Sequence, residues 1–294
     1  MHIGIDARFF GPFGKGLGRY TQRLVENLEK IDTENTYTIF LRRENFDDYK
    51  PKNKKFKKVC AHFEWYSVEE QTSWPQFLKR YKCDLVHFPH FNVPLLYRGN
   101  YVVTVHDLII LHFPTKKATT LGPLKYALKQ VAYKSVIKNA VNTSKHIITV
   151  SEFSKRDIVK HFNLDKEKVT VTYEAADFSV NQSASFEEIS KKYNIKKKSY
   201  ILYVGNAYPH KNIEKLIEAF KKVHNKQPNT KLVLVGKMDY FYKRVKDFAK
   251  KENVSNVVFP GYVTDEELVA LYNNCVVYTF PSLYEGFGLP PLEA

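Results

Sequence analysis

The stretch Tyr203-Val-Gly205-Asn206-Ala-Tyr-Pro-His210-Lys211-Asn212 joins an apolar run to a helical pattern. The run before Gly205 is rich in β-branched and aromatic residues, which favours a strand, and the glycine and proline that follow favour a turn. A strand, a short turn and a helix in succession are the unit from which helix-covered parallel sheets are built. The stretch therefore predicts an α/β fold.

The same alternation extends over the rest of the chain. The sequence predicts strands at 2–6, 37–41, 58–61, 85–88, 101–105, 146–150, 169–172, 200–204, 232–235, 257–259 and 276–279. It predicts helices at 18–30, 68–80, 123–141, 154–161, 213–224, 240–250 and 265–272. The polar stretch that begins at Asn181 interrupts this order and predicts a linker with a short helix.

We therefore expect two Rossmann-like domains that face each other across a ligand cleft. The first is expected at 1–178, a linker at 179–198 and the second domain at 199–294. The second domain has four predicted strands, and its last helix has barely begun when the chain ends at Ala294. We expect this domain to be incomplete and the chain to be a fragment.

The composition indicates a globular protein, with 44% hydrophobic and 26% charged residues. No apolar run is long enough for a membrane span, and the N-terminus does not resemble a secretory signal. The cysteines, Cys60, Cys83 and Cys275, are odd in number and each lies beside apolar residues. Buried free thiols in a reducing compartment are expected, which favours a cytoplasmic location.

A formal net charge of +15 indicates either an anionic partner or a solvated lysine-rich face. The range Lys50–Lys58 holds six lysines, and Leu108–Ser151 holds seven with no acidic residue. Nucleic acid is disfavoured as a partner, because Lys50–Lys58 contains one aromatic residue and the chain has no recognised RNA or DNA motif. The predicted helix 123–141 carries lysines at 125, 129, 134 and 138 among apolar residues. It could lie as a basic amphipathic helix on an anionic membrane or pack on the sheet.

Glycines follow the first predicted strand, at Gly11, Gly14, Gly16 and Gly18. Glycines at a strand-to-helix turn let the backbone approach an anionic ligand. Arg19 stands where the dinucleotide motif G-x-G-x-x-G requires a third glycine. Dinucleotide binding is therefore disfavoured. A nucleoside-triphosphate loop is also disfavoured, because no Gly-Lys-Ser/Thr motif follows the strand.

Polar residues follow several predicted strands at the ends where open α/β sheets bind ligands. His106 ends the fifth strand and has either a site role or a structural one. His87 and His90 could form a metal pair, but no third ligand is suitably spaced. The chain has no Asp-x-Asp pair, so no metal and no cofactor are expected.

Lys211 precedes a helix, where its charge opposes the helix dipole, so a negative ligand such as a diphosphate is expected there. The chain ends in Pro281-Ser-Leu-Tyr-Glu285-Gly286-Phe287-Gly288-Leu289-Pro-Pro-Leu-Glu293-Ala294. The glycine-rich turn and the helix start at Pro290 expose backbone N–H groups. Two carboxylates beside such a turn can bind the hydroxyls of a nucleotide sugar.

Together these segments resemble the retaining glycosyltransferase family 4, which has the GT-B fold of two Rossmann-like domains. The resemblance spans the whole chain, and its most specific part is the motif E-x7-E at Glu285 and Glu293. It includes the Val-His106-Asp-Leu strand end, the Thr149-Val-Ser-Glu-Phe-Ser-Lys segment and the loop with Lys211. The resemblance implies a metal-independent enzyme that transfers a sugar from a nucleotide-diphosphate donor to a glycan or lipid-linked acceptor.

The resemblance also implies roles for individual residues. The first domain would be the acceptor side, His106 would contact the transferred sugar, and Lys211 would bind the diphosphate and stabilise it as it leaves. Glu285 would bind the sugar and Glu293 the ribose. The remaining donor contacts would come from Gly14, Gly16, Asn206, Gly286, Phe287, Gly288 and Leu289.

The chain departs from the family pattern in two places. Asn206 stands where many relatives have an arginine, and Glu174-Ala-Ala-Asp177 replaces Asn-Gly-Val-Asp. The loop with Lys211 is similar to bacterial mannosyltransferases of surface polysaccharide synthesis, which favours mannose. The alternatives are a sugar-nucleotide epimerase or phosphorylase on the same fold, a basic nucleic-acid-binding protein, or a noncatalytic remnant.

Overall fold

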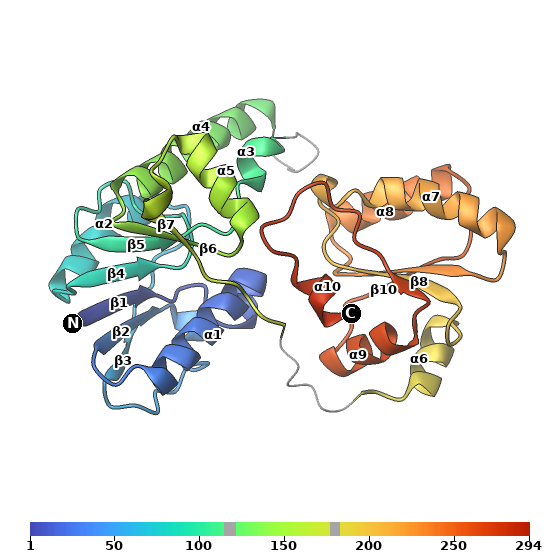
Figure 1. Ribbon diagram of the computed structural model, residues 1–294, viewed down its shortest axis with the longest axis horizontal. Helices are drawn as coiled ribbons and strands as arrows, with labels where there is room; N and C mark the ends of the chain where they lie inside the picture. The colour runs from blue at the N-terminus through green and yellow to red at the C-terminus, as the bar shows by residue number, and fades with distance from the viewer. Residues whose placement is uncertain (115–121, 177–182) are drawn as a thin grey trace. The chain divides into compact units, whose positions relative to one another are not determined.

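The computed structural model describes residues 1–114, 122–176 and 183–294. The chain divides into two compact units (Figure 1). Unit 1 consists of Met1–Leu108 and Gly122–Tyr173, and unit 2 consists of Ile109–Leu121 and Glu174–Ala294. Each unit is built around a parallel sheet with its own hydrophobic core, so the predicted α/β class is confirmed.

Unit 1 contains a seven-stranded parallel sheet in the order β3-β2-β1-β4-β5-β6-β7. The strands are β1 (His2–Asp6), β2 (Thr36–Leu41), β3 (Phe56–Cys60), β4 (Leu85–Phe88), β5 (Tyr101–Thr104), β6 (His146–Thr149) and β7 (Val169–Val171). The strand order reverses between β1 and β4, which pair directly with each other. Loops that leave the carboxyl ends of strands at such a reversal commonly bind ligands.

The sheet of unit 1 is accompanied by four longer helices: α1 (Lys15–Ile31), α2 (Val68–Arg80), α4 (Pro123–Thr143) and α5 (Glu152–Phe162). Two of them begin at serine caps, as the Ser67 hydroxyl accepts from the Glu70 N–H and the Ser151 hydroxyl from the Ser154 N–H. Such caps satisfy backbone donors that a helix start leaves without a partner. α5 ends at Asn163 in the left-handed conformation, which stops the helix.

Unit 2 contains a four-stranded parallel sheet in the order β10-β9-β8-β11. Its strands are β8 (Tyr200–Val204), β9 (Lys231–Val235), β10 (Val257–Gly261) and β11 (Val277–Tyr278). The described helices are α3 (Ile109–His112), α6 (Phe186–Tyr193), α7 (Ile213–Lys226), α8 (Tyr240–Lys251), α9 (Asp265–Asn274) and α10 (Leu289–Glu293). The order reverses between β8 and β11, so the loops after these strands flank the second switch point.

Residues inside the expected linker 179–198 belong to the core of unit 2. Phe186, Ile189 and Ile195 are buried against Tyr200 and Leu271. Phe186 and Ile189 are three positions apart, so they share one face of α6. Asp177 and the start of the expected linker lie outside the described residues.

Two expectations about side chains are wrong. Cys60 is exposed rather than buried, because it ends β3 at the edge of the sheet. The apolar residues of α4 do not form one face, so the helix is not amphipathic. Val136 and Ile137 are buried in its second half, whereas Leu128 and Val131 are each 64% exposed.

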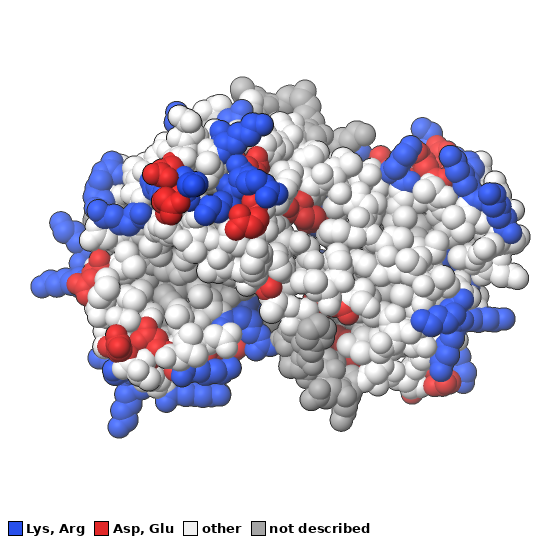
Figure 2. Space-filling model, viewed as in Figure 1, with Lys and Arg blue, Asp and Glu red and all other residues white. Residues whose placement is uncertain are grey.

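The lysine-rich composition does not produce one continuous basic surface on the face shown in Figure 2. Lysine and arginine side chains lie around the periphery of each unit there, with acidic side chains among them. Within the described part of the chain, no helix has the length and apolarity that crossing a membrane would require.

Candidate functional site

Lys211 and Glu285 form an ion pair in unit 2. Lys211 Nζ lies 2.6 Å from Glu285 Oε1, and the two side chains are only 15% and 19% exposed. Lys211 follows β8 and Glu285 follows β11, so the pair joins the two loops that flank the switch point. The side chains that the sequence predicted as donor ligands are therefore in contact at the position where α/β sheets bind ligands.

Backbone contacts also join these two loops. The Leu283 N–H donates to the His210 carbonyl at 2.8 Å, and Asn212 Nδ2 donates to the Pro281 carbonyl at 3.2 Å. Asn212 is in the left-handed conformation, with φ of 59°, and it ends the short helical turn Pro209–Lys211 before α7 begins. This arrangement fixes the start of the Lys211 side chain relative to the loop that carries Glu285.

The turn at Gly205 depends on the absence of a side chain. Its φ of 154° is rarely adopted by other residues, and a Cβ there would lie 2.8 Å from the Tyr203 hydroxyl. The Tyr203 hydroxyl donates to the Asn206 carbonyl at 2.8 Å, and Tyr242 donates to the Gly205 carbonyl at 2.9 Å. Two buried tyrosines thus hold the backbone of the loop on which Asn206 lies.

Glu293 lies on the short helix α10 and accepts a hydrogen bond of 3.3 Å from the Tyr272 hydroxyl. Tyr278 lies close to both motif carboxylates: burial and the charges of Glu293 and Glu285 raise the pKa of its hydroxyl. That hydroxyl is buried without a hydrogen-bond partner among the described residues. Gly288, which lies between Glu285 and Glu293 in the chain, has a φ of 93°, a backbone conformation that favours glycine at the start of α10.

Aromatic residues surround the Lys211 loop. Burial and the neighbouring charge of Lys211 lower the pKa of His210 to about 4, so its imidazole is neutral at pH 7. The segment after β5 contributes two more rings. The ring centroid of His112 lies 5.3 Å from that of Tyr284, and the centroid of Phe113 lies 6.3 Å from that of His210. No pattern in the sequence indicated that a segment so close to His106 in the chain would pack with unit 2.

The glycines after β1 have different structural roles. A Cβ on Gly14 would lie 2.0 Å from the Phe9 carbonyl oxygen, and one on Gly18 would lie 2.1 Å from that of Gly11. These two positions are therefore required for the loop to fold back on the start of α1. A Cβ on Gly16 would contact nothing within 4 Å, so this glycine leaves open space beside the backbone.

His106 lies just after β5 in unit 1 and is held on several sides. Its Nε2 lies 3.0 Å from the Pro89 carbonyl oxygen, and its ring is nearly perpendicular to that of Tyr20 at a centroid distance of 4.6 Å. The Ser154 hydroxyl donates to its backbone carbonyl at 2.9 Å. These contacts hold the imidazole at the carboxyl end of the sheet, and they are compatible with either a structural or a ligand-binding role.

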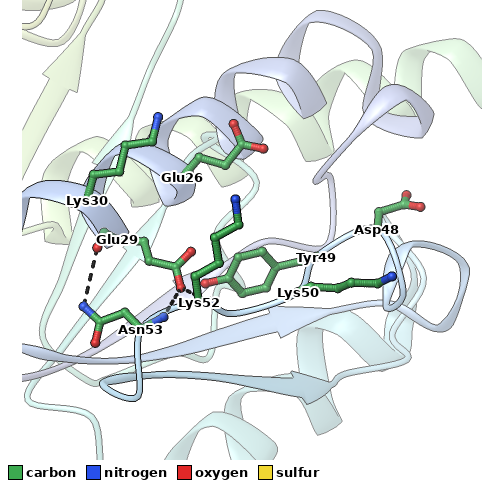
Figure 3. Close-up of a pocket in the computed structure, with 8 residues that line it drawn as sticks. All are labelled: Glu26, Glu29, Lys30, Asp48, Tyr49, Lys50, Lys52 and Asn53. Carbon is green, nitrogen blue, oxygen red and sulfur yellow. Dashed lines mark hydrogen bonds between the residues drawn. The ribbon is translucent and has the colours of Figure 1, made fainter.

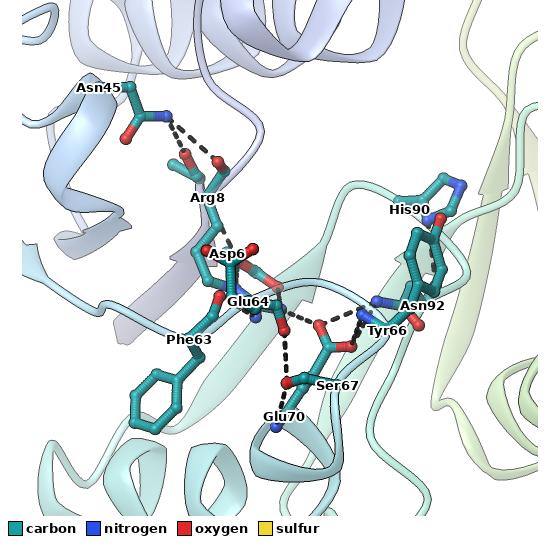
Figure 4. Close-up of polar contacts among 11 residues, drawn as sticks. Asp6, Arg8, Asn45, Phe63, Glu64, Tyr66, Ser67, Glu70, His90 and Asn92 are labelled. Atoms are coloured by element: carbon teal, nitrogen blue, oxygen red, sulfur yellow. Dashed lines mark hydrogen bonds and ion pairs between the residues drawn. The ribbon is translucent and has the colours of Figure 1, made fainter.

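A buried ionic network beside β1 was not foreseen from the sequence (Figure 4). Arg8 is fully buried and pairs with Asp6 at 2.8 Å and with Glu70 at 2.7 Å. Asn92 donates to both oxygens of Glu70, which is also fully buried, and burial raises the pKa of that carboxyl. The charged pattern Asp-x-Arg inside an apolar strand end was the available signal, since charges so placed need buried partners.

One cluster of possible metal ligands lies among the described residues, and it contains none of the predicted site residues. Its members are Glu44, His62 and Glu64, which are all exposed. Among the described residues, this is the one group of three or more His, Cys, Asp or Glu residues whose ligand atoms all lie within 4.8 Å of one another. Arg42 donates to both carboxylates of this set, at 3.0 and 2.5 Å. One of their two negative charges is thus already compensated by the Arg42 guanidinium.

A cavity of about 510 Å³ lies on unit 1, away from the predicted site residues (Figure 3). It is lined by side chains of both charges, and Glu29 accepts from the Asn53 N–H at 2.8 Å at its wall. The lining residues are Glu26, Glu29, Lys30, Asp48, Tyr49, Lys50, Lys52 and Asn53. Because its charges largely compensate one another, the cavity does not indicate an anionic ligand.

The predicted residues thus form two groups on separate units. Lys211 and Glu285 are in direct contact in unit 2, with Asn206 and Glu293 on the adjoining loop and helix. Gly14, Gly16 and His106 lie at the carboxyl end of the sheet in unit 1.

Comparisons with known proteins identify the family of the chain. The sequence profile of "Glycosyltransferase Family 4" matches residues 14–180, and that of "Glycosyl transferases group 1" matches residues 185–294. The O-antigen chain mannosyltransferase RfbU of Salmonella typhimurium is 33% identical over 230 residues. That match covers 78% of this chain and 58% of RfbU. The O-antigen chain mannosyltransferase B of Escherichia coli is 29% identical over 95% of this chain and 76% of its own length.

Solved structures share the fold. Sucrose-phosphate synthase from Thermosynechococcus elongatus superposes with a TM-score of 0.71 at 17% identity, over 100% of this chain and 78% of that one. WaaG, a glycosyltransferase involved in lipopolysaccharide biosynthesis, gives a TM-score of 0.69 at 19% identity over the same shares of the two chains. Both similarities indicate the GT-B fold. The chain spans 58% of the length of RfbU. Because the family profile matches residues 14–180, more than half of the chain, the chain belongs to glycosyltransferase family 4.

Proposed function

We propose that this chain transfers a sugar from a nucleotide-diphosphate sugar to a glycan or lipid-linked acceptor, with mannose as the favoured sugar. The observation that carries the proposal is the contact between Lys211 and Glu285 at the switch point of unit 2. An ammonium and a carboxylate side by side can bind the two halves of such a donor. The cation suits the diphosphate, and the carboxylate accepts from sugar hydroxyls.

The chemistry proposed for Lys211 is stabilisation of the leaving group. Negative charge develops on the diphosphate as the bond to the sugar breaks, and a preorganised cation lowers the energy of that state. The hydrogen bonds that join the two loops hold the ammonium in place before the donor binds. We propose that no metal ion is required, since Lys211 and backbone N–H groups supply the positive charge.

The remaining assignments are also proposals. His106 would contact the transferred sugar, Glu293 the ribose, and the loop with Gly16 the donor phosphates or the acceptor. The sugar would keep its anomeric configuration, through a front-face path without a protein nucleophile. Mannose is favoured because two relatives, which match over 78% and 95% of this chain, are named as O-antigen chain mannosyltransferases.

Product analysis tests this function. The chain is incubated with isotope-labelled GDP-mannose, UDP-sugars or dTDP-sugars, with and without a panel of mannosides and lipid-linked glycans. The proposal predicts a labelled glycoside with retained configuration only when an acceptor is present, and unchanged turnover in EDTA. Consumption of the donor by epimerisation without an acceptor would contradict it.

Peripheral contact with an anionic membrane is a further part of the proposal. Leu128 and Val131, three positions apart on α4, are both exposed, and lysines occur at positions 129, 134 and 138 of the same helix. Although α4 as a whole is not amphipathic, these two apolar side chains can enter the headgroup region, and the nearby lysines are attracted to anionic lipid. In liposome flotation, we expect binding to anionic but not to neutral vesicles, and Leu128→Ser/Val131→Ser should abolish it. Flotation with neither vesicle would end this part of the proposal.

A further inference from the structure

Tyr66 has an unusual backbone conformation. Its φ of 60° lies in the left-handed region, where a tyrosine is an outlier, and its side chain is nonetheless 51% exposed. Its N–H donates to Glu70 Oε2 at 2.7 Å, so the conformation is imposed by the buried network of Arg8, Glu70 and Asn92. Figure 4 shows the Tyr66 ring extending away from the Glu70 carboxylate. Strain of this kind is maintained where the surrounding structure overdetermines it, and it is concentrated at functional sites.

The Tyr66 ring is the end of a continuous series of ring contacts. Trp65 stacks on Phe9 with centroids 4.1 Å apart, and Phe9 lies 5.4 Å from His90. The series continues through His90–Phe91, Phe91–Tyr133 and Tyr133–Tyr66, at 4.1, 6.3 and 5.5 Å. We call these residues the aromatic platform: Phe9, Trp65, Tyr66, His90, Phe91 and Tyr133.

The platform lies at the switch point of unit 1. Phe9 follows β1 and His90 follows β4, the two strands between which the order reverses. Trp65 and Tyr66 follow the edge strand β3, and Tyr133 lies on α4. Ligands of open α/β sheets bind at this position. Of the platform residues, only His90 stands out in the sequence, and only as a candidate metal ligand.

His90 adds a neutral hydrogen-bonding group to these rings. The Asn92 N–H donates to His90 Nδ1 at 3.3 Å, so in the neutral imidazole Nε2 carries the proton and acts as a donor. Burial and the neighbouring His106 lower the pKa of His90 to about 3, so the ring stays neutral at pH 7. Flat apolar rings beside a neutral donor suit a ligand with an apolar C–H face and hydroxyl groups.

We propose that the aromatic platform binds a neutral pyranose ring of the acceptor glycan and that Tyr66 determines the affinity for it. This inference rests on the proposed transferase function and names residues for its acceptor. The C–H face of the pyranose packs on the exposed Tyr66 ring, whose face carries partial negative charge. A sugar hydroxyl accepts from His90 Nε2.

Binding is tested separately from catalysis by fluorescence. The chain has two tryptophans, of which Trp74 is fully buried and Trp65 belongs to the platform. Methyl α-D-mannopyranoside and the methyl glycosides of glucose, galactose and N-acetylglucosamine are titrated against the chain. We expect at least one of them to change the emission saturably in the wild type but not in Trp65→Phe. The absence of a saturable change with the whole panel would overturn the proposal.

Tyr66→Gly separates recognition from folding, because glycine tolerates the left-handed backbone that tyrosine adopts under strain. We expect its affinity for the bound glycoside to fall at least tenfold, with a melting temperature no lower than that of the wild type. Tyr66→Phe should retain binding, because the contact is made by the ring. The matched control is Lys82→Gly, which relieves a left-handed residue (φ of 48°) after α2 and should leave affinity unchanged. Unchanged affinity in Tyr66→Gly would overturn the proposal.

Kinetics distinguish a failure of this inference from a failure of the proposed function. In a transfer assay, Tyr66→Gly should raise the KM for the acceptor at least tenfold and leave the KM for the donor unchanged. If the wild type transfers sugar and both constants are unchanged in Tyr66→Gly, the inference is wrong and the transferase function stands. If no donor and acceptor react but the glycoside titration still depends on Tyr66, the transferase function is wrong.

Discussion

Lys211 and Glu285 are 74 positions apart in the chain, and their side chains meet at 2.6 Å across the switch point of unit 2. The contact does not follow from the local sequence of either residue, since each lies in a loop after a different strand. The pair exists because β8 and β11 are neighbours in the sheet, which brings the ends of these loops together. The donor site proposed here depends on that adjacency.

Glu285→Gln is predicted to weaken binding of the nucleotide sugar but not of the free nucleoside diphosphate. The carboxylate is assigned to sugar hydroxyls, and a hydrogen bond to a charged group contributes about 1.5–3 kcal/mol, which is roughly a 10- to 100-fold change in affinity. Isothermal titration of both ligands measures the difference. The control is Glu218→Gln, which breaks an exposed pair with Lys215 on α7 and should change neither affinity. Equal losses for the two ligands would contradict the assignment.

Gly16→Ala and Gly18→Ala are predicted to have different effects, because an added Cβ has room at Gly16 but not at Gly18. A Cβ on Gly18 would lie 2.1 Å from the Gly11 carbonyl oxygen, so the loop must move, at a cost of about 1–3 kcal/mol or more. A Cβ on Gly16 meets nothing, so stability in urea should be unchanged within about 0.5 kcal/mol. If the open space beside Gly16 receives a ligand, Gly16→Ala should nevertheless weaken donor or acceptor binding. Normal binding in this variant would remove Gly16 from the site.

Glu70→Gln is predicted to destabilise unit 1 by about 3–5 kcal/mol, because it leaves the buried guanidinium of Arg8 with one carboxylate fewer. Urea unfolding followed by circular dichroism measures the loss. The neighbouring residue provides the control, since Glu69 is exposed on α2 and Glu69→Gln should cost less than about 0.5 kcal/mol. Similar stability of the two variants would show that the network is not required for folding.

The stability of the fold is predicted to fall in mild acid. Burial, together with the neighbouring His106, lowers the pKa of His87 to about 4 and that of His90 to about 3. Between pH 6.5 and pH 4 the unfolded chain therefore binds protons that the folded chain does not. Each histidine then lowers the free energy of unfolding by up to about 1.4 kcal/mol per pH unit.

His87→Gln tests this pH dependence. The variant is predicted to be less stable at pH 7, because the contact of 2.8 Å between His87 Nε2 and Thr104 Oγ1 is altered. Its stability should nevertheless fall less steeply than that of the wild type as the pH is lowered from 6.5 to 4. Urea unfolding at a series of pH values gives both slopes, and equal slopes would refute the assignment of this dependence to His87.

Much of the fold followed from local patterns. Strand and helix periods predicted both parallel sheets, because β-branched runs and helical patterns alternate wherever strands are buried on both faces. The segment Ile109–His112 was less visible, since its structure depends on packing against distant residues. A local pattern does not carry that information.

The candidate site was predictable only in part. Lys211 and Glu285 could be named because glycine-rich turns and strand ends mark ligand loops, whereas their mutual contact depends on the strand order of unit 2. The role of Tyr66 could not be found from its sequence neighbours. Its conformation is imposed by Glu70, whose position depends on a buried arginine on β1's loop. Long-range pairings of this kind require the folded structure.

The most direct test of the account is thermal stabilisation of the wild type, Lys211→Gln and Lys215→Gln by GDP-, UDP- and dTDP-sugars. A ligand that binds the folded state raises the melting temperature in proportion to the logarithm of its concentration over its dissociation constant. Lys215 is an exposed lysine of α7 that lies four positions from Lys211, so it controls for the loss of one charge. The account predicts that one class of nucleotide sugar stabilises the wild type and Lys215→Gln, and that Lys211→Gln loses this stabilisation. Equal stabilisation of all three proteins, or of none, would contradict a donor site at Lys211.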